Sequence, residues 1–404
     1  AVAADAGPGE GQRVRARARV ADDQREAFLG YLAGQVRVIT PVKDAAGVVL
    51  FRPWAPGTAV ELDILLAKQS AKEYVLRQSE TYLKYQYTME GSAAAVTDTP
   101  EQAAHAATAV EAEGAGLAAA QDAAVTAREV VSVEALDDAP AQVIFGLRPC
   151  DARGFAQMDN VFGGYGGFYF DPYYNAKREA TTLVAVTCRA PRSTCFCTSV
   201  GGSPAGTDGV DALATQVDGG LTLEALTPKG EALLGFTGLA DVSPDQGASA
   251  ETVKEHAASR VDVAFDLAGV RDNLRANIED AAWHDLAMRC ISCGTCTYVC
   301  PSCYCFNITD EMVETRGERI RTWDNCFNPS YTLETSGHNP RDLKSNRFRN
   351  RFSHKFWYYP DKYDSLLCSG CGRCTTHCPT RIDIREVVRV MGAPRVTAAT
   401  GEEA

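Results

Sequence analysis

Two cysteine runs in the last third of the chain share one spacing, and they constrain the fold more than any other feature. Each run reads C-x2-C-x2-C-x3-C-P, with Cys290, Cys293, Cys296, Cys300 and Pro301 in the first and Cys368, Cys371, Cys374, Cys378 and Pro379 in the second. This is the spacing with which bacterial two-cluster proteins bind cubane iron–sulfur clusters. The short gaps let three thiolates of one tight loop reach three irons, and the fourth thiolate lies farther along the chain.

The fourth cysteine of each run is expected to bind the cluster of the other run. The expected ligands of the first [4Fe–4S] cluster are Cys290, Cys293, Cys296 and Cys378, and those of the second are Cys368, Cys371, Cys374 and Cys300. The alternative function, from a different class of protein, is a non-redox scaffold stabilised by zinc. Zinc sites, however, are typically built from paired C-x2-C knuckles and do not require a doubled four-cysteine run with prolines. The spacing therefore favours two cubane clusters.

The composition is that of an ordinary globular protein, and it argues against some classes of partner. The chain has 404 residues, 45% apolar and 23% charged, which is enough for two or three domains. Its net charge of −12 argues against nucleic acid, because phosphate binding needs a basic face. We find neither an apolar run near the roughly 20 residues that span a bilayer nor the apolar core of a signal peptide. We therefore expect a cytoplasmic protein without a membrane segment.

Fifteen cysteines, an odd number, indicate metal ligands rather than a disulfide framework, in a setting where oxygen is scarce. Outside the two runs, Cys150 and Cys188 follow predicted buried strands at residues 142–147 and 182–187. A helix from Pro149 to Phe162 is expected between these strands, and strand–helix–strand order implies an α/β layer.

Cys195 and Cys197 are placed on the same side of an extended chain. Strand ends are where α/β folds place their sites. The four thiols Cys150, Cys188, Cys195 and Cys197 therefore favour a third cluster, with buried free thiols as the alternative. For Cys303, Cys305 and Cys326, packing or supporting roles beside the clusters are expected rather than a further metal site.

The predicted fold class is α+β, with an N-terminal α/β domain at residues 1–250 and an α-helical dicluster ferredoxin module at residues 251–404. Residues 301–367 lie between Cys300 and Cys368, so the two runs are farther apart in the sequence than in a compact bacterial ferredoxin. Helices are expected at 272–288 and 382–390, a linker near 245–255 and an alanine-rich insertion, helical or flexible, at 93–128. The alternating segment 14–20 predicts an edge strand or, in preference, a solvated basic arm.

The sequence leaves two alternative roles for each of two groups of cations. Arg341, Lys344, Arg347, Arg349, Arg351 and Lys355 lie between the runs. They are expected either to neutralise the anionic clusters and raise their potentials or to form a docking patch for an acidic partner. Lys68, Lys72 and Lys84 lie in a segment, 60–87, that has helical spacing in places, and a solvated face is the preferred interpretation of them.

Motifs for catalysis or nucleotide binding are missing from the sequence. We find no Ser/His/Asp arrangement, H-E-x-x-H, P-loop or G-x-G-x-x-G. The prediction is therefore an electron-transfer chain without a catalytic residue of its own.

Several segments together resemble the beta subunits of sulfhydrogenase-type NiFe hydrogenases. They are Phe145-Gly-Leu-Arg-Pro-Cys150-Asp151, Asp171-Pro-Tyr-Tyr174, Cys188, Cys195-Phe-Cys197, Cys300-Pro-Ser-Cys303-Tyr-Cys305-Phe, Arg319-Ile-Arg-Thr-Trp-Asp-Asn-Cys326 and His354-Lys355. The same family includes the A subunit of the anaerobic, sirohaem-linked sulfite reductase. The resemblance extends from about Leu29 to Val390, and the chain departs from it by its alanine-rich insertion and extra N-terminal residues.

The resemblance implies an electron conduit in a cytoplasmic, multi-subunit, NAD(P)-linked oxidoreductase. A flavoprotein subunit would bind FAD and NAD(P)H, and a further subunit would hold the catalytic metal centre. A NiFe hydrogenase is the leading expectation, and the sulfite reductase is the alternative.

Overall fold

The computed structural model describes residues 13–63, 66–90, 128–136, 138–165 and 169–395. Contacts divide the chain into a larger unit of residues 1–78, 138–307 and 323–404 and a smaller unit of residues 79–137 and 308–322. The fold is α+β, as predicted, with both cysteine runs in the C-terminal part of the larger unit. The alanine-rich insertion, apart from its last residue, lies outside the described residues, and the boundary near residue 250 stays a prediction.

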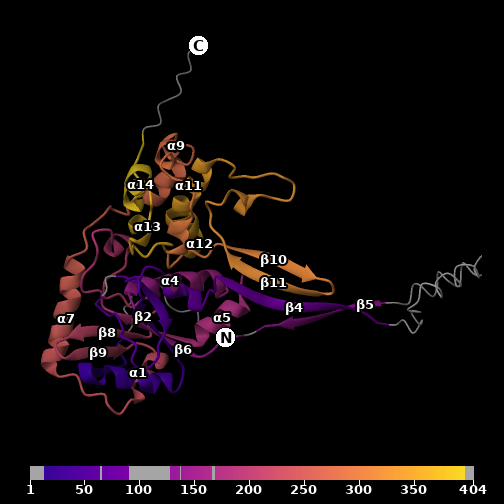
Figure 1. Cartoon of the computed structure of the whole chain (residues 1–404). Coiled ribbons are helices and arrows are strands. Elements are labelled where there is room, and N and C mark those ends of the chain that lie inside the picture. Colours follow the sequence, from indigo (N-terminus) through magenta and orange to yellow (C-terminus); the bar gives the residue numbers. More distant parts are fainter. Residues whose placement is uncertain (1–12, 64–65, 91–127, 137, 166–168, 396–404) are drawn as a thin grey trace, which may run out of the picture. The chain divides into compact units, whose positions relative to one another are not determined.

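A seven-stranded mixed sheet forms the first half of the larger unit, in the order β1-β9-β8-β7-β6-β2-β3 (Figure 1). Its strands are β1 (Ala16–Ala21), β2 (Arg37–Lys43), β3 (Val49–Pro53), β6 (Gln142–Leu147), β7 (Thr181–Val186), β8 (Ala212–Val217) and β9 (Gly220–Ala225). The four inner strands from β2 to β8 are parallel. The expected strands at 142–147 and 182–187 are confirmed. The preferred basic arm at 14–20 was wrong, because this segment pairs with β9 as the edge strand β1.

Alternating side chains of β6 and β7 supply both faces of the sheet, as a two-residue period requires. Val143 and Val184 pack with α1 (Arg25–Ala33) on one face, whereas Ile144 and Leu183 pack with α4 (Pro149–Phe162) on the other. Figure 1 shows α1 and α4 on opposite sides of the sheet. The parallel strands are therefore buried on both faces, and their carboxyl ends lead into the predicted cysteine positions.

The remaining helices of this half are α5 (Pro172–Glu179), α6 (Pro228–Ala232) and α7 (Pro244–Ser259). Helix α7 replaces the linker expected near 245–255. Its start is a capping box in which the Ser243 hydroxyl accepts from the Gln246 N–H at 3.2 Å and the Gln246 side chain accepts from the Ser243 N–H at 3.1 Å. The S-x-x-Q pattern before a helix is a recognised start signal, so the sequence held the evidence for α7.

The smaller unit is a four-stranded sheet in the order β10-β11-β4-β5. Its strands are β4 (Ser79–Glu90), β5 (Arg128–Ala135), β10 (Phe306–Val313) and β11 (Arg316–Trp323), of which β10 begins and β11 ends in the larger unit. Inside this sheet the Arg321 guanidinium bonds the Glu80 carboxylate at 3.1 Å. Residues 60–87, which have helical spacing in places, contain the start of β4 and a short 3-10 turn at Ala71–Tyr74.

The C-terminal part of the larger unit is mainly helical. Its helices are α8 (Val270–Ala276), α9 (Ala282–Ala287), α10 (Thr295–Tyr298), α11 (Lys344–Ser353), α12 (Tyr359–Tyr363), α13 (Arg373–Thr376) and α14 (Ile384–Met391). Trp283, Phe348, Phe352 and the apolar face of α14 form its core. The helix expected at 272–288 is broken in two because the buried Asn277 side chain donates to Met391 O and Ala393 O near the end of α14. The β10–β11 hairpin between the runs was not predicted.

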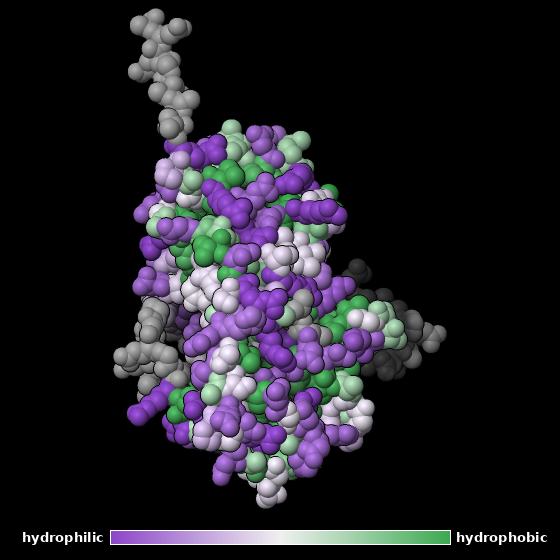
Figure 2. Space-filling view, turned by 90° about the vertical axis from the view of Figure 1, so that its left-hand side faces the viewer, coloured by the Kyte–Doolittle hydropathy of each residue, from purple (hydrophilic) through white to green (hydrophobic). Residues whose placement is uncertain are grey.

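On the face shown in Figure 2, hydrophilic side chains predominate and hydrophobic side chains form small separate groups. Among the helices of the described segments, none combines the length and the apolar character needed to cross a bilayer.

Candidate metal centres

The two cysteine loops have the same backbone turns. In the first loop Ser292 and Gly294 have φ of 57° and 71°, and the equivalent Gly370 and Gly372 of the second loop have φ of 67° and 72°. Left-handed residues at these positions reverse the chain twice within one short loop, which lets successive thiols converge. Gly294 and Gly372 are the N-caps of α10 and α13, so both loops have the same local backbone pattern.

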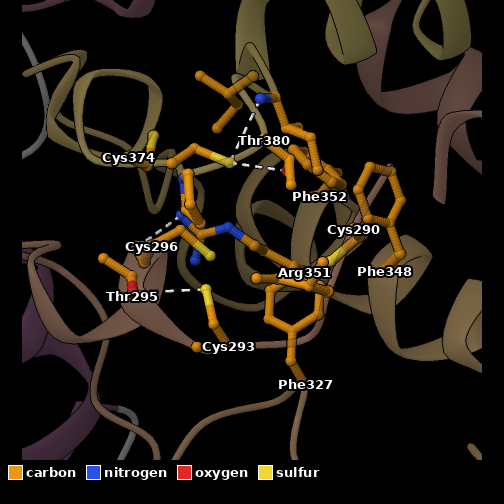
Figure 3. Close-up of a pocket in the computed structure, with 16 residues that line it drawn as sticks. Cys290, Cys293, Thr295, Cys296, Phe327, Phe348, Arg351, Phe352, Cys374 and Thr380 are labelled. Carbon is orange, nitrogen blue, oxygen red and sulfur yellow. Dashed lines mark hydrogen bonds between the residues drawn. The ribbon is translucent and has the colours of Figure 1, made fainter. Parts of the chain in front are cut away.

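A pocket lies between the two loops and collects thiols from both runs (Figure 3). Its lining includes Cys290, Cys293, Cys296 and Cys378, together with Cys374 and the rings of Phe327, Phe348 and Phe352. The sulfur of Cys378 is oriented by the Thr380 hydroxyl at 3.4 Å and the Ile382 N–H at 3.3 Å. Thiols at a mainly apolar wall are the donor set that a cubane cluster needs, so the residues fit such a group.

A second pocket is lined by Cys300, Cys368, Cys371 and Cys374. Each pocket therefore contains thiols of one run and the fourth thiol of the other run. This is the arrangement that crossed ligation requires, and the assignment of each thiol to a cluster stays a prediction.

Burial holds the thiols of Cys296 and Cys368 in the protonated form when no iron is bound. It raises the pKa of Cys296 to about 12 and that of Cys368 to about 11. Iron binds the thiolate, so cluster assembly must release these protons.

Two buried cations, Lys355 and Arg351, line the second pocket, and Arg351 also lines the first. Lys355, on a π-helical turn at residues 354–358, donates to the Cys300 sulfur at 3.5 Å and to Leu367 O at 2.8 Å. Arg351 donates to the Cys303 sulfur at 3.4 Å and to Cys296 O at 3.0 Å. The side chains of Lys355 and Arg351 are 2% and 3% exposed. Burying a charge costs several kcal/mol unless an opposite charge compensates it, and an anionic cluster would supply that charge.

Lys72 is a third such cation, and sequence reasoning missed it. It was expected on a solvated face, but it is buried and donates to Cys303 O at 2.7 Å and Thr297 O at 3.4 Å. Burial lowers the pKa of Lys72, and the thiols of Cys303, Cys300 and Cys305 oppose this shift. The residues next to a lysine in the sequence do not show whether it is exposed to solvent or buried with its charge neutralised by other groups.

The other cations between the runs have structural partners. Arg347 is buried and donates to Phe327 O at 3.1 Å, while Arg349 pairs with Glu279 at 3.0 Å. Lys344 donates to Met288 O at 3.2 Å and lies close enough to Cys290 for its charge to act on that thiol. The contacts of Lys355 and Arg351 therefore favour the role of neutralising the clusters for these two residues.

We expect Lys355→Met to make the reduction potential of the centre at Cys300 more negative by on the order of 100 mV. The reason is the loss of one buried positive charge a few ångströms from a thiolate, which is worth about 3 kcal/mol at an effective dielectric constant near 20. EPR-monitored redox titration would measure the shift. Lys362→Gln, which removes an exposed cation of α12, should leave the potential unchanged, and equal potentials in all three proteins would contradict the proposed role.

The structure brings the four candidate thiols of the third site into one region, and three of them line two different pockets. Cys150 and Cys197 line one pocket, whereas Cys188 lines another beside Arg148. Burial raises the pKa of Cys197 to about 12, and the nearby thiols of Cys195 and Cys188 add to this effect. The charges of Cys150 and Cys188 also influence each other.

The loop of Cys195 and Cys197 packs directly against the second cysteine run. The Phe196 N–H donates to Gly370 O at 2.9 Å, and the Cys195 sulfur lies 3.7 Å from Cys371 O. A Cβ atom at Gly370 would lie 2.5 Å from the Cys197 Cα, so this contact requires glycine. A centre held by these thiols would therefore adjoin the second pocket.

Cys303, Cys305 and Cys326 lie next to the second pocket. Cys305 O accepts from the Asp324 N–H at 3.0 Å, and hydrogen bonds from the Cys326 thiol and the Tyr331 hydroxyl lower the pKa of Cys305 to about 6 despite burial. Within the described ranges, no three His, Cys, Asp or Glu side chains are arranged to hold a single metal ion.

Comparisons with known proteins support the presence of iron–sulfur clusters in this part of the chain. A family model described as a 4Fe-4S dicluster domain matches residues 289–382. Sulfhydrogenase 2 subunit beta from Pyrococcus furiosus is 31% identical to the chain over 244 residues, which cover 60% of this chain and 71% of that relative. No solved structure matches the chain. The segment matched by the family model contains both cysteine runs.

Proposed function

Since the chain belongs to the family of sulfhydrogenase-type beta subunits, we propose that it is the iron–sulfur conduit of a multi-subunit, NAD(P)-linked hydrogenase. The observation that carries this proposal is the pair of pockets in which thiols of both runs meet. Cubane clusters bound there would pass single electrons. The remaining parts of the proposal are a cytoplasmic location, a flavoprotein partner with FAD and NAD(P)H, and a NiFe partner subunit.

The chain's own residues hold and tune the centres. The first pocket is assigned to a cluster on Cys290, Cys293, Cys296 and Cys378, and the second to a cluster on Cys368, Cys371, Cys374 and Cys300. The Phe327, Phe348 and Phe352 rings give the first pocket an apolar wall. Lys355 stabilises negative charge at the second pocket, and Arg351, which lines both pockets, does so at each of them, which favours the reduced state.

A third cluster on Cys150, Cys188, Cys195 and Cys197 is part of the proposal. Its support is the burial of these thiols and the contact of their loop with the second run. We expect a fully reconstituted chain to contain about 12 irons, four for each of three cubanes. Iron and protein analysis would measure this ratio. About eight irons would mean that these four residues are packing thiols.

The donor specificity of the isolated chain tests the conduit function. Iron–sulfur clusters pass one electron at a time, so the two-electron donor NADPH requires a flavin that the sequence gives no motif to bind. We expect dithionite or a reduced viologen to bleach the cluster absorbance near 400 nm anaerobically, and NADH or NADPH to leave it unchanged. Adding the flavoprotein partner should then make the clusters reducible by a nicotinamide nucleotide. Rapid bleaching of the flavin-free chain by NADPH alone would contradict the proposal.

The A subunit of an anaerobic sulfite reductase is the second candidate, because the resemblance in the cysteine segments covers both complexes. The two candidates differ in the catalytic partner, which would carry NiFe or sirohaem. Isolation of the native complex followed by metal and haem analysis separates them.

A further inference from the structure

Cys305 and Cys326 lie together at the open end of the β10–β11 hairpin. Cys305 directly precedes β10, Cys326 follows soon after β11, and the two strands are neighbours in one sheet (Figure 1). The pairing continues beyond the strands, because the Asp324 N–H donates to Cys305 O at 3.0 Å. The chain then turns, with the Asn328 N–H donating to Asn325 O at 3.1 Å, and the two thiols are hydrogen-bond partners. Thiols in direct contact meet the first requirement for a disulfide.

The two thiols have different surroundings. Cys326 is buried, at 8% exposed, whereas Cys305 is only partly buried. Hydrogen bonds from the Cys326 thiol and the Tyr331 hydroxyl lower the pKa of Cys305 to about 6, and the positive charge of Lys72 adds to this effect. The same contact with Cys305 raises the pKa of Cys326 well above its usual value. One sulfur is therefore a partly accessible thiolate, and the sulfur that touches it keeps its proton.

This combination is typical of redox-sensitive cysteine pairs. A hydroperoxide reacts with a thiolate that is accessible and lies near positive charge, and a second thiol in contact then resolves the oxidised product. Among the described residues that line the two pockets assigned to clusters, neither Cys305 nor Cys326 occurs. Both thiols therefore stay free of iron in the proposed ligand sets and are available for chemistry of their own.

We propose that Cys305 and Cys326 form a peroxide-reactive pair that is oxidised reversibly to a disulfide. The Cys305 sulfur attacks one oxygen of the hydroperoxide, so that an S–O bond forms, the O–O bond breaks and the other oxygen takes a proton and leaves as water or an alcohol. The Cys326 sulfur then attacks the sulfenic acid at Cys305. The S–S bond forms, the S–O bond breaks, and the hydroxyl leaves with the Cys326 proton as water. A dithiol reverses the oxidation by thiol–disulfide exchange.

The test adds an equimolar amount of hydrogen peroxide, under anaerobic conditions, to the cluster-loaded full chain and stops the reaction with catalase. The remaining thiols are blocked with N-ethylmaleimide while the chain is denatured with a chelator, and peptides are mapped by mass spectrometry without reduction. A peptide pair joined through Cys305 and Cys326 should appear, while the cluster absorbance measured before denaturation is retained. Dithiothreitol added after the peroxide should restore both thiols to the blocked form.

Three variants separate the roles of the thiols. Cys326→Ser leaves the sulfenic acid unresolved, so dimedone, which reacts with sulfenic acids, should label Cys305 and no joined peptides should form. Cys305→Ser removes the thiolate, so the loss of the Cys326 thiol to peroxide should be about tenfold slower or more. Cys303→Ser changes a buried neighbouring thiol outside the pair and should form the same disulfide as the wild type. Iron content and circular dichroism should be equal in all variants.

Cys305 and Cys326 that both remain open to N-ethylmaleimide after the peroxide would overturn the proposal. A disulfide between Cys305 and a different cysteine would do the same. A disulfide that forms only in parallel with loss of the cluster absorbance would also overturn it, because the pair would then react only after the centres break down. The proposal is independent of the conduit function, which would fail alone if the chain formed this disulfide but its clusters accepted no electrons.

Discussion

Cys378→Ser should remove the cluster bound by Cys290, Cys293 and Cys296, although Cys378 belongs to the other run. The reason is that Cys378 lines the first pocket, where the Thr380 hydroxyl and the Ile382 N–H orient its sulfur. A serine hydroxyl is a poor substitute for a thiolate ligand of iron. About four irons per chain should be lost, with the EPR signals of the remaining reduced clusters retained.

Two variants control this experiment. Cys300→Ser should remove the other cluster, because Cys300 lines the second pocket with Cys368 and Cys371. Cys303→Ser changes a neighbouring buried thiol that is not assigned as a ligand, and both clusters should remain. If Cys378→Ser removed the cluster of Cys368 and Cys371 and spared the first, the crossed assignment would be wrong.

Asp151→Asn should destabilise the larger unit by about 3–5 kcal/mol, because it leaves Arg373 buried without its counter-charge. The Arg373 guanidinium makes two bonds to the Asp151 carboxylate, at 2.7 and 2.9 Å, and both side chains are buried. Asp151 lies at the start of α4 and Arg373 at the start of α13, so this ion pair joins the sheet to the second cysteine loop. Both the stability and the retention of iron in the second pocket should therefore decrease.

Denaturant titration of the loaded chain, followed by circular dichroism and by cluster absorbance, would measure both effects. Glu231→Gln is the matched control, since it removes one partner of the exposed Arg15–Glu231 pair at 3.0 Å. An exposed pair is worth about 0–1 kcal/mol, so this variant should resemble the wild type. A similar small effect for Asp151→Asn would show that the buried pair contributes little to the fold.

Features that depend on neighbouring residues could be predicted from the sequence. The strands at 142–147 and 182–187 are apolar runs between turn signals, and the helix after Pro149 begins where proline is favoured. The cysteine spacing likewise places thiols of one loop on one side of a tight turn, and the matching φ values at Gly294 and Gly372 agree with that local rule. In each case the information lies within a few residues of the element that it specifies.

Local patterns failed where pairing with a distant segment decides the structure. Residues 14–20 form a strand because β9, some 200 positions later, offers them a free edge. Residues 60–87 have helical spacing in places, yet β4 there pairs with β11 across more than 200 residues. Strand pairing depends on the whole sheet, so the partner of a strand cannot be predicted from a short segment of sequence.

By itself the sequence determined the two cysteine loops, the buried strands at 142–147 and 182–187, and the family. The tertiary structure alone decided which thiols share a pocket, that Lys72 from the N-terminal part is buried beside Cys303, and that Asp151 faces Arg373. The physical reason is that spacing sets which way a side chain points along its own element. Its burial and its counter-charge depend on elements that reach it only when the chain has folded.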